Sequence, residues 1–379
     1  MTSWAATDVV HRVAGYGLPG AAPALPPDVL DDETWETVLT AVVHDRVTGH
    51  LVQALYDGAF SATEHQHAAA IAAHERVLAL ALVLERLLLR TIAYLNEANI
   101  TTRVLKGPAI AHAVYPEPGL RSFGDIDLLV PKRDYDAALT WLCARGARRR
   151  DPQGLAEAFN RRFGKGVTLE VPGGLEIDLH RMFVAGPFGL AVDTNALFRS
   201  STKFSLGGYE IEGLDPEARF LHACFHAALG DAQPGLVALR DVAQMTLCST
   251  LDASRVRDLC REWRCGIVVQ RATRLAWDTF EVDSTPEVVQ WARVYEPTRF
   301  ERQALLGYVG VDRSHARQAV AGLQAIRGFR AKVSYAATLL VPTRPYAWTG
   351  DSSYLRRAGR VLRLFLADRS ERRRHASGA

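Results

Sequence analysis

Two aspartates separated by one residue are the first feature of this chain that could support metal chemistry. Asp125 and Asp127 lie in the run DIDLLV, whose aliphatic residues are typical of a strand. Side chains alternate between the two faces of a strand, so both carboxylates project from the same face. Adjacent carboxylates repel each other unless a cation lies between them, and Mg²⁺ binds oxygen ligands together with substrate phosphates. The pair therefore predicts a site for Mg²⁺ or Mn²⁺.

A second strand-like run, LEIDLH, places Glu176, Asp178 and His180 on one face by the same alternation. If the two strands are neighbours, Asp178 joins Asp125 and Asp127. Three carboxylates can hold two metal ions, one at the attacking oxygen and one at the leaving group of a nucleoside triphosphate. His180 is either a contact to substrate or phosphate, or a hydrogen-bonded structural histidine. Glu176 is either a site residue or a solvated carboxylate.

Groups that could bind a triphosphate precede the aspartates. Lys106 and Gly107 lie where the strand-like TTRVLKG gives way to the helix-like GPAIAHAVY. A helix N-terminus offers free backbone N–H groups and the positive end of the helix dipole. Arg121 and Ser122 are further candidate phosphate contacts. Asp241, in a later helical stretch, is a candidate contact to nucleotide or acceptor, or an ordinary ion-pair residue.

The run VLKGPAIAHAVYPEPGLRSFGDIDLLV, with the later LEIDLH, resembles the polymerase-β-type nucleotidyltransferase superfamily, in particular the bacterial "nucleotidyltransferase family protein" group. In that group a Lys-Gly turn precedes an Arg-x-x-x-Asp-x-Asp strand, and a third aspartate precedes a histidine. The resemblance implies that Asp125 and Asp127 bind metal. It also implies that Asp178 is the third carboxylate, which in the superfamily often acts as base toward the attacking hydroxyl. The likeness spans about residues 30 to 280.

Gly107-Pro108 departs from the Gly-Gly or Gly-Ser that is commonest in the superfamily, and the gap from Gly107 to Asp125 is longer than usual. Because Pro108 has no N–H to donate, we expect triphosphate binding to differ in detail. The carboxylates are unaffected.

These residues predict a magnesium-dependent transfer of a nucleoside monophosphate from an NTP, ATP included, to an acceptor hydroxyl with release of pyrophosphate. The acceptor would be a small molecule, a peptide or a protein. The same cleft could instead serve glycosyl transfer from a sugar nucleotide, or belong to a non-catalytic nucleotide-binding scaffold. A formal net charge of +3 argues against nucleic acid as partner.

The elements that must position the site divide the chain into four sections. We expect a helical N-terminal region over 1–98, a nucleotidyltransferase α/β core over 99–212, a helical C-terminal domain over 213–345, and a basic helix and tail over 346–379. The fold class is therefore predicted as α+β: a small mixed β-sheet flanked by helices, with a helical N-terminal arm and a helical C-terminal domain.

Turn and cap residues support this division. Pro-Gly-Gly between KGVTLEV and GLEIDLH and Gly-Gly between KFSL and YEIEGL predict two hairpins. The stretch 64–98 has no Gly or Pro and predicts one long, largely buried helix. Asp215 and Ser254 predict helix N-caps, and Pro286 predicts a break. His222 and His226, one helical turn apart, could bind zinc, but no third ligand is evident; His226 facing the cleft is the alternative.

The cysteine content and the apolar stretches of the chain indicate its cellular compartment. Five cysteines without a CxxC pair predict buried free thiols in a reducing cytosol. The N-terminus has no basic region followed by an apolar core, so no signal peptide is expected. The most apolar stretch, 77–89, contains Glu85 and Arg86 and is too short to cross a membrane. We therefore expect a cytoplasmic protein.

Overall fold

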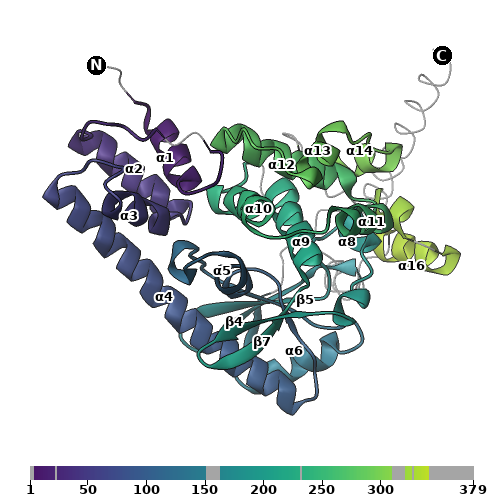
Figure 1. Cartoon of the computed structure of the whole chain (residues 1–379). Helices are drawn as coiled ribbons and strands as arrows, with labels where there is room; N and C mark the ends of the chain where they lie inside the picture. The colour runs from purple at the N-terminus through teal and green to yellow at the C-terminus, as the bar shows by residue number, and fades with distance from the viewer. Residues whose placement is uncertain are drawn as a thin grey trace, which may run out of the picture.

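The computed structural model describes residues 4–21, 24–150, 163–230, 233–309, 321–326 and 328–340. Within them the fold is α+β, as predicted: one mixed seven-stranded sheet with helices before, between and after its strands (Figure 1). The predicted basic helix and tail at 346–379 lie outside the described residues. In the part of the chain that is described, no helix is both long enough and apolar enough to cross a membrane.

The strands of the sheet follow the order β3-β4-β5-β2-β1-β7-β6. Their bounds are β1 (Arg103–Val104), β2 (Ile126–Leu129), β3 (Arg148–Arg150), β4 (Gly166–Val171), β5 (Leu175–His180), β6 (Thr202–Leu206) and β7 (Tyr209–Gly213). β2 is parallel to β5 and β1 to β7, whereas the other pairs are antiparallel. Both predicted hairpins are confirmed, as β4–β5 and β6–β7. The edge strand β3 was not predicted, because three exposed arginines carry no apolar alternation.

The other described elements are helices. Before the sheet lie α1 (Ala6–Gly15), α2 (Asp32–His44), α3 (Thr48–Tyr56) and α4 (Glu64–Glu97). Between strands lie α5 (Pro108–Val114), η1 (Pro118–Leu120), α6 (Tyr135–Ala144), α8 (Pro187–Ala191) and η2 (Ala196–Phe198). After the sheet lie α9 (Pro216–Leu229), α10 (Leu236–Cys248), α11 (Ala253–Trp263), α12 (Gly266–Phe280), α13 (Glu287–Val294), α14 (Arg299–Leu305) and α16 (Phe329–Leu340).

Two of the three predicted helix signals in the C-terminal half are confirmed. Asp215 caps α9 through its carboxylate, which accepts the backbone N–H of Ala218, and Pro286 immediately precedes α13. The prediction for Ser254 was wrong. Asp252 caps α11 by accepting the backbone N–H groups of Ser254 and Arg255, since a carboxylate placed just before the helix reaches both donors.

Alternation along the central strands gives the sheet two different faces. Ile126 and Leu128 of β2 pack with α4 and α6 in one apolar core. The Asp127 side chain projects from the opposite face of the sheet. Leu129 projects from that same face and packs in the second apolar core, which the N-terminal helices form with the helices after the sheet and which is called the helical layer below. The carboxylates of β2 and β5 therefore face the helices rather than the α4 side of the sheet.

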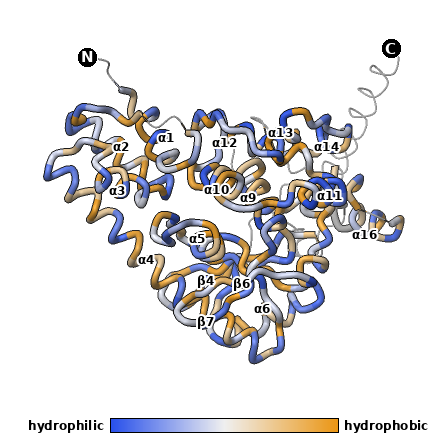
Figure 2. Tube along the Cα trace, in the orientation of Figure 1, coloured by the Kyte–Doolittle hydropathy of each residue, from blue (hydrophilic) through white to orange (hydrophobic). Residues whose placement is uncertain are grey.

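Helix α4 has the predicted length but not the predicted burial. Thr63 and Gln66 form a capping box at its start. Apolar and polar residues mix along the whole helix (Figure 2), yet only one face is buried, and Leu82 is 67% exposed. A high density of leucine and alanine does not distinguish a helix buried all round from one that packs on a single side.

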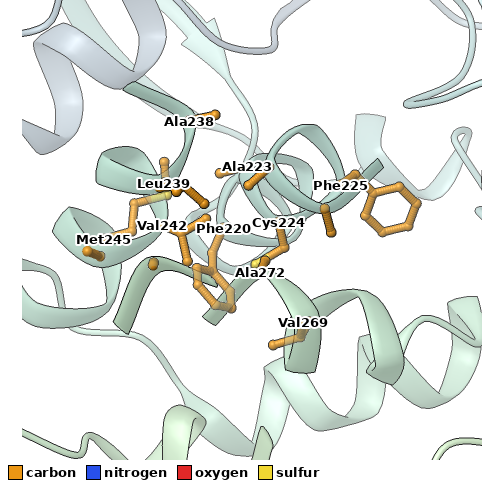
Figure 3. Packing of buried hydrophobic residues seen from close by; sticks show 14 of the residues in the cluster. Phe220, Ala223, Cys224, Phe225, Ala238, Leu239, Val242, Met245, Val269 and Ala272 are labelled. Atoms are coloured by element: carbon orange, nitrogen blue, oxygen red, sulfur yellow. The ribbon is translucent and has the colours of Figure 1, made fainter. Parts of the chain in front are cut away.

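The largest core joins N-terminal helices with helices that follow the sheet. Phe220 and Cys224 of α9 pack against Val242 of α10 and Ala272 of α12 (Figure 3). Val13 of α1 belongs to the same cluster. The N-terminal helices and the helices after the sheet therefore share one apolar core above the sheet.

All five cysteines lie in the described part of the chain and are free thiols, as predicted. Cys224, Cys260 and Cys265 are buried, whereas Cys143 and Cys248 are exposed, so the expectation of burial holds for only part of the set. Burial raises the pKa of the Cys224 thiol well above its usual value, which keeps this thiol protonated and unreactive.

Candidate active site

Parallel pairing of β2 with β5 brings predicted site residues together. Asp127 and Asp178 are register partners, so their side chains leave neighbouring strands on the same face. His180 follows two residues further along β5. Ligand atoms of Asp127, Asp178 and His180 all lie within 4.8 Å of one another. This spacing is small enough for one metal ion to contact all three.

Lys106 lies between the two members of the Asp-x-Asp pair. Its Nζ is 3.0 Å from Asp127 Oδ2 and 3.3 Å from Asp125 Oδ2, and its side chain is 15% exposed. Burial by itself lowers the pKa of Lys106, but the two carboxylates outweigh burial and raise the pKa above its usual value. Lys106 is therefore cationic, and its ammonium lies between the two carboxylates, where the sequence predicted a metal ion.

Asp127 is the most enclosed of the carboxylates, at 1% exposed. Burial favours its neutral form, but the Lys106 ammonium and the hydrogen bond with His180 hold its pKa well below the usual range. His180 Nε2 is 2.9 Å from Asp127 Oδ1, and Nδ1 is 3.3 Å from the Met182 carbonyl oxygen. Burial lowers the pKa of His180, so an ionised carboxylate faces a neutral imidazole.

The remaining carboxylates are more accessible. Asp178 accepts a 2.6 Å hydrogen bond from Thr168 Oγ1, its register partner on β4. Asp125, just before β2, has a second cation beside it: Nη1 of Arg46 lies 3.8 Å from its Oδ1. These two carboxylates are about a third exposed, and a ligand can reach them from solvent.

Clefts reach the carboxylates from two sides. A cleft of about 300 Å³ includes Asp178 and Lys165 in its wall. A larger one of about 880 Å³ has Lys106, Asp125 and His226 in its wall, together with residues of α1, α2 and the start of α10. The site thus lies between the sheet and the helical layer, with room for different ligands on its two sides.

Hydrogen bonds already engage the backbone N–H groups after Gly107, where the sequence predicted a phosphate contact that stays a prediction. Gly107 has φ +60° and ψ −117°, a conformation that only glycine adopts without strain, which accounts for the residue type. The next N–H groups are already used: Ala109 donates to the Lys106 carbonyl, and Ile110 and Ala111 donate to that of Gly107. Pro108 has none, so the first turn of α5 has few free donors for phosphate.

Arg121, Ser122 and Asp241 contact other protein groups. The Arg121 guanidinium is 4% exposed and pairs with Asp241 through contacts of 2.8 Å and 3.3 Å. Tyr115 donates a 3.0 Å hydrogen bond to the same carboxylate, and Ser122 Oγ donates to the Arg46 carbonyl oxygen at 3.0 Å. Neither cleft above includes these three predicted residues in its wall. Their contact with a nucleotide stays a prediction.

Of the two histidines of α9, His222 is buried and His226 is partly buried. Burial, assisted by the charge of Lys106, lowers the pKa of His226 to about 3, so the imidazole that faces the larger cleft is neutral. His222 packs edge-on against Phe183, with ring centroids 4.7 Å apart. Among the described residues the three-ligand group is Asp127, Asp178 and His180, so a zinc site at the α9 pair finds no support. Glu176 forms an ion pair with Arg150.

Sequence reasoning missed several residues near the site. Thr168 could have been found from the hairpin register, since the Pro-Gly-Gly turn places it opposite Asp178. Lys165 lies in the smaller cleft, and its charge lowers the pKa of both Asp127 and His180. No spacing rule connects Arg46 with Asp125, because the two lie far apart in the chain and meet only through tertiary packing.

A sequence model of the family described as "uncharacterised nucleotidyltransferase" matches residues 31–281, more than half of the chain. The chain belongs to this family. The matched segment contains every residue of the carboxylate site, and the resemblance inferred from the Lys-Gly, Asp-x-Asp and third-aspartate motifs is confirmed. No curated protein matches the chain.

Solved structures match this chain at low identity. They include the solution structure of the antibiotic-resistance factor ANT(2'')-Ia, at 16% identity over 48% of this chain and 90% of that chain, with a TM-score of 0.33. A crystal structure of ANT(2'')-Ia in complex with adenylyl-2''-tobramycin is 17% identical over 48% and 96%, with a TM-score of 0.32. An antigenic nucleotidyltransferase-like protein from Paracoccidioides brasiliensis is 14% identical over 54% and 92%, also with a TM-score of 0.32.

Proposed function

We propose that this protein transfers a nucleoside monophosphate from an NTP to an acceptor hydroxyl, with release of pyrophosphate, and that Mg²⁺ or Mn²⁺ is required. The observation that carries the proposal is the in-register pairing of Asp127 with Asp178, next to Asp125 and Lys106, in a member of a nucleotidyltransferase family. The family supplies the reaction class, and the site supplies the residues.

The donor set fits a hard divalent cation. Asp125, Asp127 and Asp178 offer carboxylate oxygens, which suit Mg²⁺ and Mn²⁺. With the ring proton on Nδ1, His180 would donate to the Met182 carbonyl and present Nε2 to the ion in place of its hydrogen bond with Asp127, an arrangement common for histidines at metal sites. When bound, the ion would neutralise charge on the triphosphate and on the leaving pyrophosphate.

The side chains of the protein would contribute to catalysis by positioning the substrates and by supplying charge. Asp178 would accept the proton of the acceptor hydroxyl, and the hydrogen bond from Thr168 fixes the orientation of its carboxylate. Lys106 would contribute positive charge toward the triphosphate. Because Asp178 and Lys106 line different clefts, the acceptor would approach through the smaller cleft and the donor through the larger one.

The acceptor is a small molecule, a peptide or a protein in this proposal, and the reaction takes place in the cytoplasm, where NTP is available. The alternatives are glycosyl transfer from a sugar nucleotide and a non-catalytic scaffold. No separate observation favours either alternative, and the experiment below is designed to distinguish both from nucleotidyl transfer.

Isothermal titration of the four ribonucleoside triphosphates, with and without Mg²⁺, tests the proposal. We expect metal-dependent binding of at least one NTP to the wild type and its loss in Asp125→Asn/Asp127→Asn. Asp258→Asn, an exposed carboxylate on α11, is the matched control and should bind like the wild type. Binding of a sugar nucleotide but of no NTP would establish glycosyl transfer instead. Binding of an NTP without release of pyrophosphate in an acceptor screen would identify the scaffold instead. If neither ligand binds, the catalytic proposal and the nucleotide-binding scaffold both fail.

A further inference from the structure

Arg46 reaches the aspartates of the sheet from the N-terminal helices. It lies in the turn between α2 and α3, and it lines the larger cleft with Lys106 and Asp125. Its Nη1 is 3.8 Å from Asp125 Oδ1, which is longer than a charge-assisted hydrogen bond. The side chain is 45% exposed. A guanidinium is thus held beside the site with most of its donors still available to a ligand.

The position of Arg46 is determined both by the turn between α2 and α3 and by the segment that precedes Asp125. Its backbone has φ +61°, a left-handed conformation that is uncommon for residues other than glycine. Its carbonyl oxygen accepts the hydroxyl of Ser122, which ties the turn to the segment that enters β2. Gly124 leaves space for the guanidinium, because a Cβ there would lie 2.9 Å from Nη2. The turn and the segment before Asp125 therefore fit each other around this side chain.

The larger cleft needs side-chain cations if it is to bind a polyphosphate. The N–H groups of residues 109–111 at the start of α5 already donate to backbone carbonyls, and Pro108 has no N–H. The helix start therefore cannot supply the usual row of phosphate donors. Among the described residues, Arg46 and Lys106 are the ion-pair partners of Asp125, and both line this cleft.

We propose that Arg46 binds the triphosphate of the donor nucleotide, so that the N-terminal helices contribute directly to the site; this inference rests on the proposed function. The guanidinium fork matches two phosphate oxygens at once, whereas Lys106 provides a single point charge. Arg46 would contact the phosphates that leave as pyrophosphate, since it approaches from the cleft side of Asp125 and not from the side of Asp178.

Titration of the NTPs and of pyrophosphate, each with Mg²⁺, tests the inference on the full chain. Arg46→Gln should weaken both by roughly tenfold or more, the loss expected for a charge-assisted hydrogen bond to phosphate. Nucleoside monophosphates, which lack the leaving phosphates, should bind the variant and the wild type equally. Arg46→Lys should recover part of the affinity. Arg133→Gln removes an exposed arginine outside both clefts and should change nothing.

A double-mutant cycle with Gly124→Ala separates a direct contact from a loss of folding. The added Cβ displaces the Arg46 guanidinium without removing it, so Gly124→Ala alone should weaken NTP binding and should add little in the Arg46→Gln background. Equal NTP affinity of Arg46→Gln and wild type would overturn the inference and leave the proposed function standing. A wild type that binds no NTP would overturn both.

Discussion

At the proposed metal site, Lys106 and a divalent cation would compete for the carboxylates of Asp125 and Asp127. Because Nζ lies 3.0 Å from Asp127 and 3.3 Å from Asp125, the ammonium repels any ion that approaches the pair without a phosphate. We expect Lys106→Gln to bind Mn²⁺ alone roughly tenfold more tightly than the wild type, and to bind NTP with Mg²⁺ more weakly. Electron paramagnetic resonance of free Mn²⁺ measures the first effect. Lys203→Gln, an exposed lysine on β6, is the control. Weaker Mn²⁺ binding by Lys106→Gln would contradict the placement of the metal.

His222 makes stability depend on pH. Burial lowers its pKa well below 6.5, so on acidification the unfolded chain takes up a proton that the folded protein refuses. The free energy of unfolding therefore falls as pH decreases through about 6.5. His222→Leu should reduce the drop between pH 7 and pH 5 by about 2 kcal/mol. Urea denaturation at both pH values measures it, and His65→Leu, on the exposed face of α4, should behave like the wild type.

The sequence was sufficient to predict which carboxylates share one face of the sheet, but not which side chains surround them. Strand alternation and the Asp-x-Asp spacing correctly place Asp127 and Asp178 on one face, because both residues lie in short, strongly patterned strands. Arg46 and Lys165 have no such pattern, and their approach depends on how helices and hairpins pack. For Arg121, the residue type suggested phosphate, but a nearby buried carboxylate satisfies it equally well.

At the scale of elements, the buried pair of Arg121 and Asp241 joins α10 to the segment that enters β2. Removing one partner leaves an uncompensated charge at a site that is 4% exposed or less. Asp241→Ala should lower the unfolding free energy by about 3 to 5 kcal/mol, whereas Arg121→Met/Asp241→Leu should recover most of it. Chemical denaturation of the wild type and the two variants measures these differences. A stable Asp241→Ala protein that no longer binds NTP would instead support the nucleotide contact predicted from the sequence.

Elements with local signals were predicted well, and those that depend on tertiary context were not. The Pro-Gly-Gly and Gly-Gly turns determine both hairpins, and the absence of Gly and Pro determines the extent of α4. Strand β3 pairs Arg148 with Glu170 across the sheet edge, an interaction that single-sequence periodicity does not contain. The buried side of α4 likewise depends on where the sheet lies.

At the scale of the molecule, the apolar core of the helical layer crosses the predicted section boundaries. Val9 and Val13 of α1 share a cluster with Val242 of α10 and Ala276 of α12, and α1 contacts both of these later helices. Arg46 and the α1 wall of the larger cleft are positioned by this core. If this core opens as one unit, the geometry of the proposed donor site depends on residues that are far apart in the chain.

Native-state hydrogen exchange tests whether helices α1–α3 open together with α10 and α12 or open by themselves. Val13→Ala removes fully buried methyl groups from α1 and should lower the opening free energy there by roughly 1 to 3 kcal/mol. If the core is cooperative, amides of α10 and α12 should lose the same amount, while Val29→Ala, at a 47% exposed position, should leave all of them unchanged. Loss of protection confined to α1–α3 would show that these helices open alone. Arg46 would then leave the donor site in each opening, and NTP should slow exchange in α1–α3 but not in α12.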